Sequence, residues 1–195
     1  MRKLFGVCGL GLIVAMAIVV NSSGNVSAQE FTYTPQFNSK NELMLPRNHI
    51  WREWVYSGAI VTPNSLKDGA APFPEFHSVW GEPGAYAYYK KTGKFPEGTG
   101  IAKELGLVGS TEAVSGNGFF MGKLQGFEIT IKSKKLYPNE PGNWAYYTFG
   151  HHAEPYNKSA KKMPAEACNA CHESTAADDF VFTQYYPFLA AAKPK

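Results

Sequence analysis

Short runs in which apolar and polar residues alternate recur along this chain, and this period of two is typical of β-strands with one face in a core. The clearest run spans residues 126–131, where Phe127, Ile129 and Ile131 take one face and Glu128 takes the other. Aromatic and β-branched residues between turn residues predict further strands of the same kind. The expected strands are residues 50–61, 73–80, 101–105, 118–132 (with a possible break at Gly122) and 144–150.

Helices are expected in fewer places. Residues 82–91 predict a helix because Pro83 stands in its first turn and Gly93 follows its end. Residues 178–192 predict a helical tail that packs aromatic side chains on the core until Pro187 interrupts it. The predicted fold class is therefore mainly β within the α+β type, an antiparallel β-sheet with a few short helices.

Two segments carry little regular pattern. Residues 29–48 predict an irregular or helical N-terminal arm, punctuated by prolines. Residues 154–162 predict a polar linker. Neither segment has the composition of a second core, so residues 29–195 are expected to form a single domain.

The first 28 residues have the pattern of a secretory signal. Arg2 and Lys3 precede an apolar run at residues 4–20, and Val26-Ser27-Ala28 supplies a small-x-small cleavage pattern. We expect cleavage near Ala28 and a periplasmic location. An uncleaved membrane anchor is the alternative, but the apolar run is short for a membrane span. No stable membrane insertion is expected after the signal is removed.

Charge narrows the class of partner. Removing 28 of the 195 residues leaves 167, and the signal carries two of the nineteen Lys and Arg and no acidic residue. The mature chain then has 17 basic and 16 acidic residues, a net charge of +1. A nearly neutral balance argues against nucleic acid as a partner.

A Cys-x-x-Cys-His motif stands at residues 168–172. On a helix, Cys168, Cys171 and His172 occupy positions i, i+3 and i+4 and share a face. This spacing suits two thioether bonds to haem vinyl groups, with His172 as axial ligand of the iron. A zinc site would need a second pair of ligands, and Cys8 leaves with the signal. We therefore predict one covalently bound haem c on a C-terminal haem-attachment helix.

Two ionisable residues lie on predicted strands. Lys103 shares a strand face with Ile101 and Leu105, so its amine points to an apolar side unless it extends to water at an edge. Glu128 points away from the apolar face of its strand, and exposure to solvent is the favoured interpretation. If that other face lines the haem instead, its carboxylate is suited to take protons from an iron-bound substrate.

The side of the haem opposite His172 is open to several interpretations. Phe73, Phe76 and His77 lie on one run, where they either wall a small-ligand pocket or pack in the core. A methionine or second histidine on the iron would instead give an electron-transfer cytochrome. The candidates for that ligand are His49, His77, His151, His152, Met44, Met121 and Met163.

Several blocks, in order along nearly all of the mature chain, resemble cytochrome P-460, a family of periplasmic c-haem proteins that oxidise hydroxylamine. The blocks are Trp54-Val55-Tyr56-Ser57-Gly58, Thr62-Pro63-Asn64, Phe73-Pro74-Glu75-Phe76-His77, Phe95-Pro96-Glu97-Gly98, Lys103-Glu104, Trp144-Ala145-Tyr146-Tyr147, the haem motif, and Asp179-Phe180-Val181-Phe182-Thr183-Gln184-Tyr185-Tyr186-Pro187.

The resemblance implies an antiparallel β fold, a homodimer, and a haem whose proximal ligand is His172. It further implies a covalent bond from the Lys103 amine to a haem meso carbon. Glu128 matches the distal carboxylate of the hydroxylamine-oxidising members. A phenylalanine on the distal side is also implied, with Phe73 the better match and Phe76 the alternative.

The function that the resemblance implies is oxidation of hydroxylamine to nitrous oxide or nitric oxide, with electrons passed to a soluble c-type cytochrome. One rival is a nitric-oxide-binding protein similar to cytochrome c′-beta, which has the same fold without the lysine bond. The other rival is the electron-transfer cytochrome described above.

Overall fold

The computed structural model describes residues 33–66, 68–71 and 73–195, so the predicted signal at residues 1–28 lies outside the described residues. Its main element is a five-stranded antiparallel sheet in which every strand pairs with its neighbour along the chain. The strands are β2 (Val55–Val61), β3 (Phe76–Gly81), β4 (Gly100–Ala113), β5 (Gly116–Lys132) and β6 (Trp144–Thr148). A small second sheet pairs β1 (Leu43–Met44) with β7 (Ser159–Ala160).

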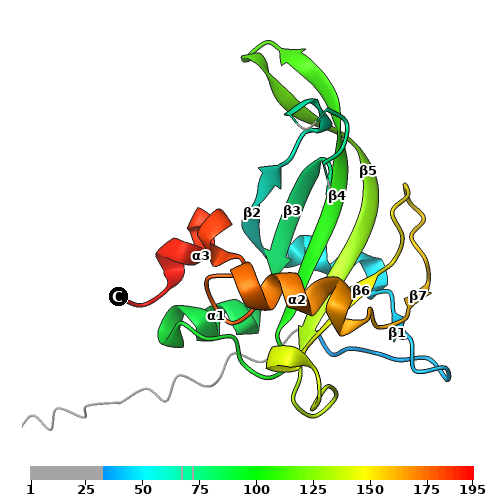
Figure 1. The fold of residues 1–195 in the computed structure, drawn as a ribbon, viewed down its shortest axis with the longest axis vertical. Helices are drawn as coiled ribbons and strands as arrows, with labels where there is room; N and C mark the ends of the chain where they lie inside the picture. The colour runs from blue at the N-terminus through cyan, green and yellow to red at the C-terminus, as the bar shows by residue number, and fades with distance from the viewer. Residues whose placement is uncertain (1–32, 67, 72) are drawn as a thin grey trace, which may run out of the picture.

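Short helices connect and cover the strands, and α1, α2 and α3 lie on one side of the main sheet (Figure 1). The α-helices are α1 (Pro83–Thr92), α2 (Ala165–Thr175) and α3 (Pro187–Ala192), and the 3-10 helices are η1 (Arg47–Glu53), η2 (Asn64–Leu66), η3 (Pro141–Asn143) and η4 (Thr183–Tyr185). The predicted fold class is confirmed. Among the described residues, no helix is long and apolar enough to cross a membrane.

The predicted helix at residues 82–91 is confirmed as α1. Glu82 accepts a hydrogen bond from the backbone N–H of Ala85, and the helix ends at Gly93 with a φ of 67°. Pro83 supplies the fixed φ of a first helical residue, and Gly93 takes the left-handed conformation at no steric cost.

The first predicted strand is wrong over its first half. Residues 50–53 belong to η1, and the strand begins only at Val55. The chain turns through Asn48 and His49, both with positive φ, and this turn places Trp51 in the core. The Trp51 ring stacks on Phe127 at 3.9 Å between centroids and is fully buried. Tertiary packing therefore overrides the local strand preference.

The β4–β5 hairpin is longer than predicted and extends past the other strands (Figure 1). The possible break at Gly122 does not occur, since β5 runs through this residue. Gly122 instead lies close to Gly109 across the hairpin. A Cβ on Gly122 would lie 2.7 Å from the Cα of Gly109. The glycine is required there by the close approach of the two strands, not by a break between them.

The sequence predicted a helical tail at residues 178–192, but the structure does not form one helix there. Asp178 and Val181 form an isolated bridge, η4 follows, and Pro187 begins α3 instead of interrupting a helix. A proline at the first helical position loses no hydrogen bond, which explains its role as a start signal here. Of the tail aromatics, Tyr186 is buried and Tyr185 is exposed.

The two faces of the main sheet cover two different cores. On one face, Trp51, Phe127 and Ile129 belong to a cluster that η1, β1 and β7 help to cover. On the other face, Val79 and Trp144 pack with residues of α1 and α3. We call these the core face and the helix face. Every strand residue belongs to one of them because side chains alternate.

Replacing Trp51 with alanine is expected to lower the free energy of unfolding by about 3–5 kcal/mol, because it removes a buried indole and leaves a cavity against Phe127. Denaturant unfolding of the purified protein measures this change. Leu66, which is 76% exposed, provides the matched control, and L66A should change the stability by less than about 0.5 kcal/mol. Equal losses in the two variants would contradict the assignment of Trp51 to the core.

Candidate functional site

The Cys-x-x-Cys-His motif lies on α2, as predicted, and α2 packs across the helix face at β6 (Figure 1). Asn169, between the two cysteines, is almost fully buried, and its side-chain amide donates to the Trp144 carbonyl at 3.0 Å. Asn169 therefore anchors α2 to the first residue of β6. The thiols of Cys168 and Cys171 are both free, and the Cys171 residue is exposed.

His172 is held in one tautomer by the segment that follows α2. Its Nδ1 lies 2.7 Å from the Phe180 carbonyl oxygen, which only accepts, so Nδ1 carries the proton and Nε2 keeps its lone pair. Burial lowers the pKa of His172 and keeps the imidazole neutral. The rings of Tyr146 and Phe182 flank it at 4.7 and 4.5 Å. A neutral imidazole with a free Nε2 is the form that ligates iron.

An ion pair fixes the segment that presents the Phe180 carbonyl. Asp179 and Phe180 both have positive φ, which non-glycine residues adopt only where the surroundings hold them. The Lys132 ammonium lies 2.5 Å from Asp179 Oδ2 and also donates to the Phe95 carbonyl. The orientation of His172 therefore depends on a contact with β5.

Lys103 and Glu128 stand directly opposite each other on β4 and β5, and both point to the helix face. Lys103 Nζ lies 2.6 Å from Glu128 Oε2, and the side chains are 26% and 22% exposed. The favoured expectation of a solvent-exposed Glu128 is therefore wrong. The alternation placed it away from Phe127 correctly, but α2 and the loop after β6 reduce the exposure of that face.

The Glu128 carboxylate carries its charge in spite of its surroundings. Burial raises the pKa of this carboxyl group, but the hydrogen bond from His151 and the positive charge of Lys103 outweigh burial and lower the pKa to about 2. An inward-facing lysine at this position is compensated by its cross-strand partner.

Phe73, not Phe76, lies beside this pair. Lys103 Nζ is 5.1 Å from the centroid of the Phe73 ring, whereas Phe76 lies on β3 next to His77 and faces the other side of the sheet. The Phe73 ring meets His77 edge-on, and His77 Nε2 donates to the Phe73 carbonyl at 2.7 Å. Burial, with the charge of Lys103, lowers the pKa of His77, so this imidazole is neutral.

Sequence reasoning missed the role of His151, which it treated only as a possible iron ligand. His151 Nε2 lies 2.8 Å from Glu128 Oε1, so each carboxylate oxygen has one partner. Residues 128 and 151 meet because the loop after β6 folds over β5. The only local signal is the pair of glycines at 126 and 150, which permit this crossing.

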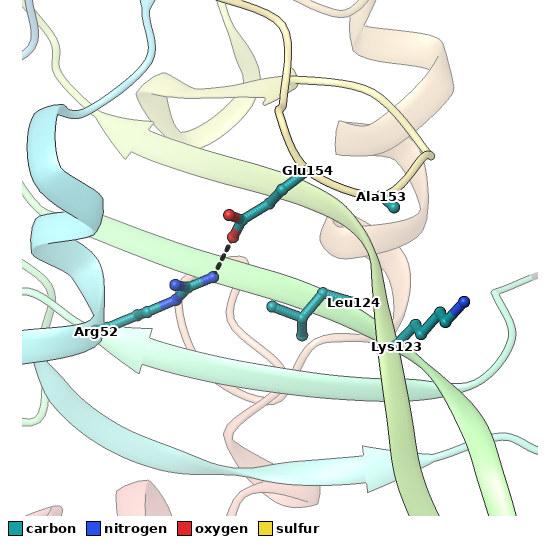
Figure 2. Close-up of a pocket in the computed structure, with 5 residues that line it drawn as sticks. All are labelled: Arg52, Lys123, Leu124, Ala153 and Glu154. Carbon is teal, nitrogen blue, oxygen red and sulfur yellow. Dashed lines mark hydrogen bonds and ion pairs between the residues drawn. The ribbon is translucent and has the colours of Figure 1, made fainter.

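The core face carries a separate charged cluster. Glu104 follows Lys103 but points the opposite way, is almost fully buried, and accepts hydrogen bonds from Arg52 and Tyr156. A hollow of about 400 Å³ lies beside it, lined by Arg52, Lys123, Leu124, Ala153 and Glu154. Figure 2 shows these lining residues and the pairing of Arg52 with Glu154. The Arg52–Glu154 pair lies within this hollow, on the face of the sheet opposite Lys103 and Glu128.

The residues on the helix face fit a haem. Two free thiols and a neutral imidazole share one face of α2, and aromatic rings flank the imidazole. A lysine, a carboxylate and a phenylalanine line the adjacent sheet. An antiparallel sheet with a Cys-x-x-Cys-His helix and these side chains on one face is typical of a haem-binding cytochrome.

The family assignment agrees with that class. The family model Cytochrome P460 matches residues 48–183, which is more than half of the chain, so the chain belongs to the cytochrome P460 family. It is therefore a haem cytochrome and, in general terms, an oxidoreductase. No curated protein matches the chain.

The low pKa of Glu128 predicts an acid-dependent loss of stability in the haem-free protein. A carboxyl group whose pKa falls from 4.5 to about 2 on folding stabilises the fold above pH 4.5, and that stabilisation is lost as the pH falls toward 2. The difference in unfolding free energy between the native chain and E128Q should therefore shrink over this interval. The exposed Glu112 on the β4–β5 hairpin is the control, and a similar trend for E112Q would contradict the assignment.

Proposed function

We propose that this protein is a haem c enzyme that oxidises hydroxylamine to nitrous oxide or nitric oxide at a lysine-linked haem and passes the electrons to an external acceptor. The observation that carries the proposal is the position of Glu128. Its carboxylate lies opposite Lys103, on the sheet face that α2 covers with the haem motif. Family membership alone does not place a proton acceptor there.

Each attachment residue has a defined part in this proposal. Cys168 and Cys171 would hold the haem through thioether bonds, His172 would ligate the iron through Nε2, and Lys103 would take the place of a hydrogen on a ring carbon. The bound haem supplies the iron that binds hydroxylamine and the path by which electrons leave. The Phe180 carbonyl orients His172, and a proximal imidazole with a hydrogen-bonded Nδ1 is a stronger ligand.

Glu128 acts as the proton acceptor. Hydroxylamine loses as many protons as electrons on its way to either product, so a base beside the substrate prevents positive charge from accumulating in a poorly solvated pocket. The bond to the ring removes the ammonium charge of Lys103. The pKa of Glu128, which that charge lowers, then rises, and the carboxylate becomes a better base.

Phe73 contributes shape to the same pocket. Its ring lies against Lys103 and His77 and is 51% exposed, so it presents an apolar wall to a ligand. An apolar wall beside a carboxylate favours a small neutral molecule such as hydroxylamine over anions.

The proposal includes the cellular location of the enzyme and its partners. The export pattern at residues 1–28 supports a periplasmic protein cleaved near Ala28, without stable membrane insertion. We infer a soluble c-type cytochrome as electron acceptor, hydroxylamine and nitric oxide as small-molecule ligands, a homodimer, and no nucleic-acid partner.

One observation favours a second candidate function. The Lys103 amine is already satisfied by Glu128 at 2.6 Å, so the fold does not require a bond to the haem. Without that bond, the protein would be a nitric-oxide-binding cytochrome similar to cytochrome c′-beta. For an electron carrier with a sixth protein ligand, three of the candidate ligands are poorly placed, because His49 and Met44 lie away from the helix face and His77 is bound to the Phe73 carbonyl.

Mass spectrometry of a protease digest of the haem-loaded protein separates these candidates. The expected result is one covalent species in which haem joins the peptide with residues 168–172 to the peptide with Lys103. K103R serves as the control, because a guanidinium cannot form the bond, and its haem peptide should appear alone. A native haem peptide without the Lys103 peptide would contradict the enzyme and favour the nitric-oxide-binding protein.

Replacing Glu128 with alanine should leave haem attachment and the absorption spectrum in place and lower hydroxylamine turnover by about 10²–10⁴-fold, the usual contribution of a general base. Steady-state assays with a c-type cytochrome as acceptor measure this loss. E112A, on the exposed hairpin, is the matched control and should turn over at the native rate. Native turnover in E128A would refute the assignment of the base.

A further inference from the structure

His151 forms a second contact with Glu128, on the side away from Lys103. Its Nε2 lies 2.8 Å from Oε1, whereas Lys103 Nζ approaches Oε2. The exposed fraction rises along this chain of contacts, from 22% for the Glu128 side chain to 54% for that of His151. A proton on Glu128 is therefore one hydrogen bond away from a group in contact with water.

The backbone is built to hold His151 in this place. The loop after β6 crosses β5 at Gly126, where a Cβ would lie 2.9 Å from the Gly150 carbonyl oxygen and 3.3 Å from the Cα of His151. Gly150 itself has a φ of 112°, and its carbonyl accepts from the Phe127 N–H. Gly126 lies two residues before Glu128 on the same face, so the crossing places His151 directly over the carboxylate.

The chemistry of repeated turnover needs such a group. Glu128 takes one proton at a time and must release it before it accepts the next. Lys103 and His77 cannot accept this proton. In the proposed enzyme Lys103 is bonded to the haem ring, and His77 is buried and hydrogen-bonded to the Phe73 carbonyl. His152 is exposed and its Nδ1 contacts the adjacent Ala153 carbonyl.

We propose that His151 is a positioning residue that relays protons from Glu128 to solvent during hydroxylamine oxidation. The inference rests on the proposed function and adds to it the path by which protons leave. In each transfer, the tautomer with its proton on Nδ1 accepts at Nε2 the proton that Glu128 releases. The resulting imidazolium loses its Nδ1 proton to water, and proton exchange with water restores the first tautomer. No electron moves in this step.

The environment of His151 suits it for this transfer. The charged groups that face it are Glu128 on β5 and Lys103 on β4. The hydrogen bond to Glu128 raises the pKa of His151 above its ordinary value, while partial burial and the charge of Lys103 oppose that rise. An imidazole in contact with a carboxylate on one side and with water on the other can exchange a proton with both.

The test compares H151Q with H152Q in the haem-loaded protein. Glutamine places an amide near the position of Nε2, so it keeps a hydrogen bond to Glu128 but does not titrate. We expect H151Q to lower kcat about tenfold or more with KM changed less than twofold, and to lose the fall in kcat at acidic pH. H152Q should behave as the native protein. H151A should recover part of its kcat when imidazole is added to the solution.

A second measurement does not depend on turnover. In the native protein, the haem midpoint potential should vary with pH as His151 titrates, because a charge beside Glu128 changes the field at the iron. H151Q should lose that variation and H152Q should keep it. Native kcat and native pH dependence in H151Q would overturn the relay while leaving hydroxylamine oxidation intact. A native protein that does not oxidise hydroxylamine would instead overturn the proposed function and the relay together.

Discussion

The antiparallel register between β4 and β5 is the constraint on which the candidate site depends. It sets Lys103 directly opposite Glu128, so that a lysine and a carboxylate that are each unfavourable in a half-buried position compensate each other. A shift of one residue in β4 would send Lys103 to the core face, where Ala102 now packs. The packing of the core face therefore determines which side chains of β4 and β5 point to the helix face.

Two segments outside the sheet adapt this arrangement to a haem. The segment after α2 turns back to present the Phe180 carbonyl to His172, and Asp179 and Lys132 hold it to β5. The loop after β6 reaches both faces of the sheet, with His151 at Glu128 and Tyr156 at the buried Glu104.

The parts of the fold that the sequence predicted are those with local causes. The alternation at residues 126–131 is sufficient to predict a strand in β5, and Pro83 and Gly93 are sufficient to predict the ends of α1. The spacing of the haem motif is sufficient to place its three residues on one face of α2. The predictions were wrong where contacts between residues far apart in the sequence determine the local structure. Trp51 turns the start of a predicted strand into η1 because it packs on Phe127. The exposure of Glu128 and its contact with His151 depend on a loop crossing whose local signal is only the pair of glycines at 126 and 150.

The state of Lys103 decides what Glu128 can do. With a hydrogen bond from His151 and an ammonium beside it, the carboxyl group has a pKa of about 2 and is a poor proton acceptor, so the pair is a structural ion pair. When the amine becomes a ring substituent, its charge is lost and the carboxylate retains only His151 as a partner able to carry charge. In the proposed enzyme, the covalent bond that changes the electronics of the haem would therefore also make Glu128 a better base. A single sheet geometry is in this way compatible with a binding protein and an enzyme, and the difference between them is one bond at residue 103.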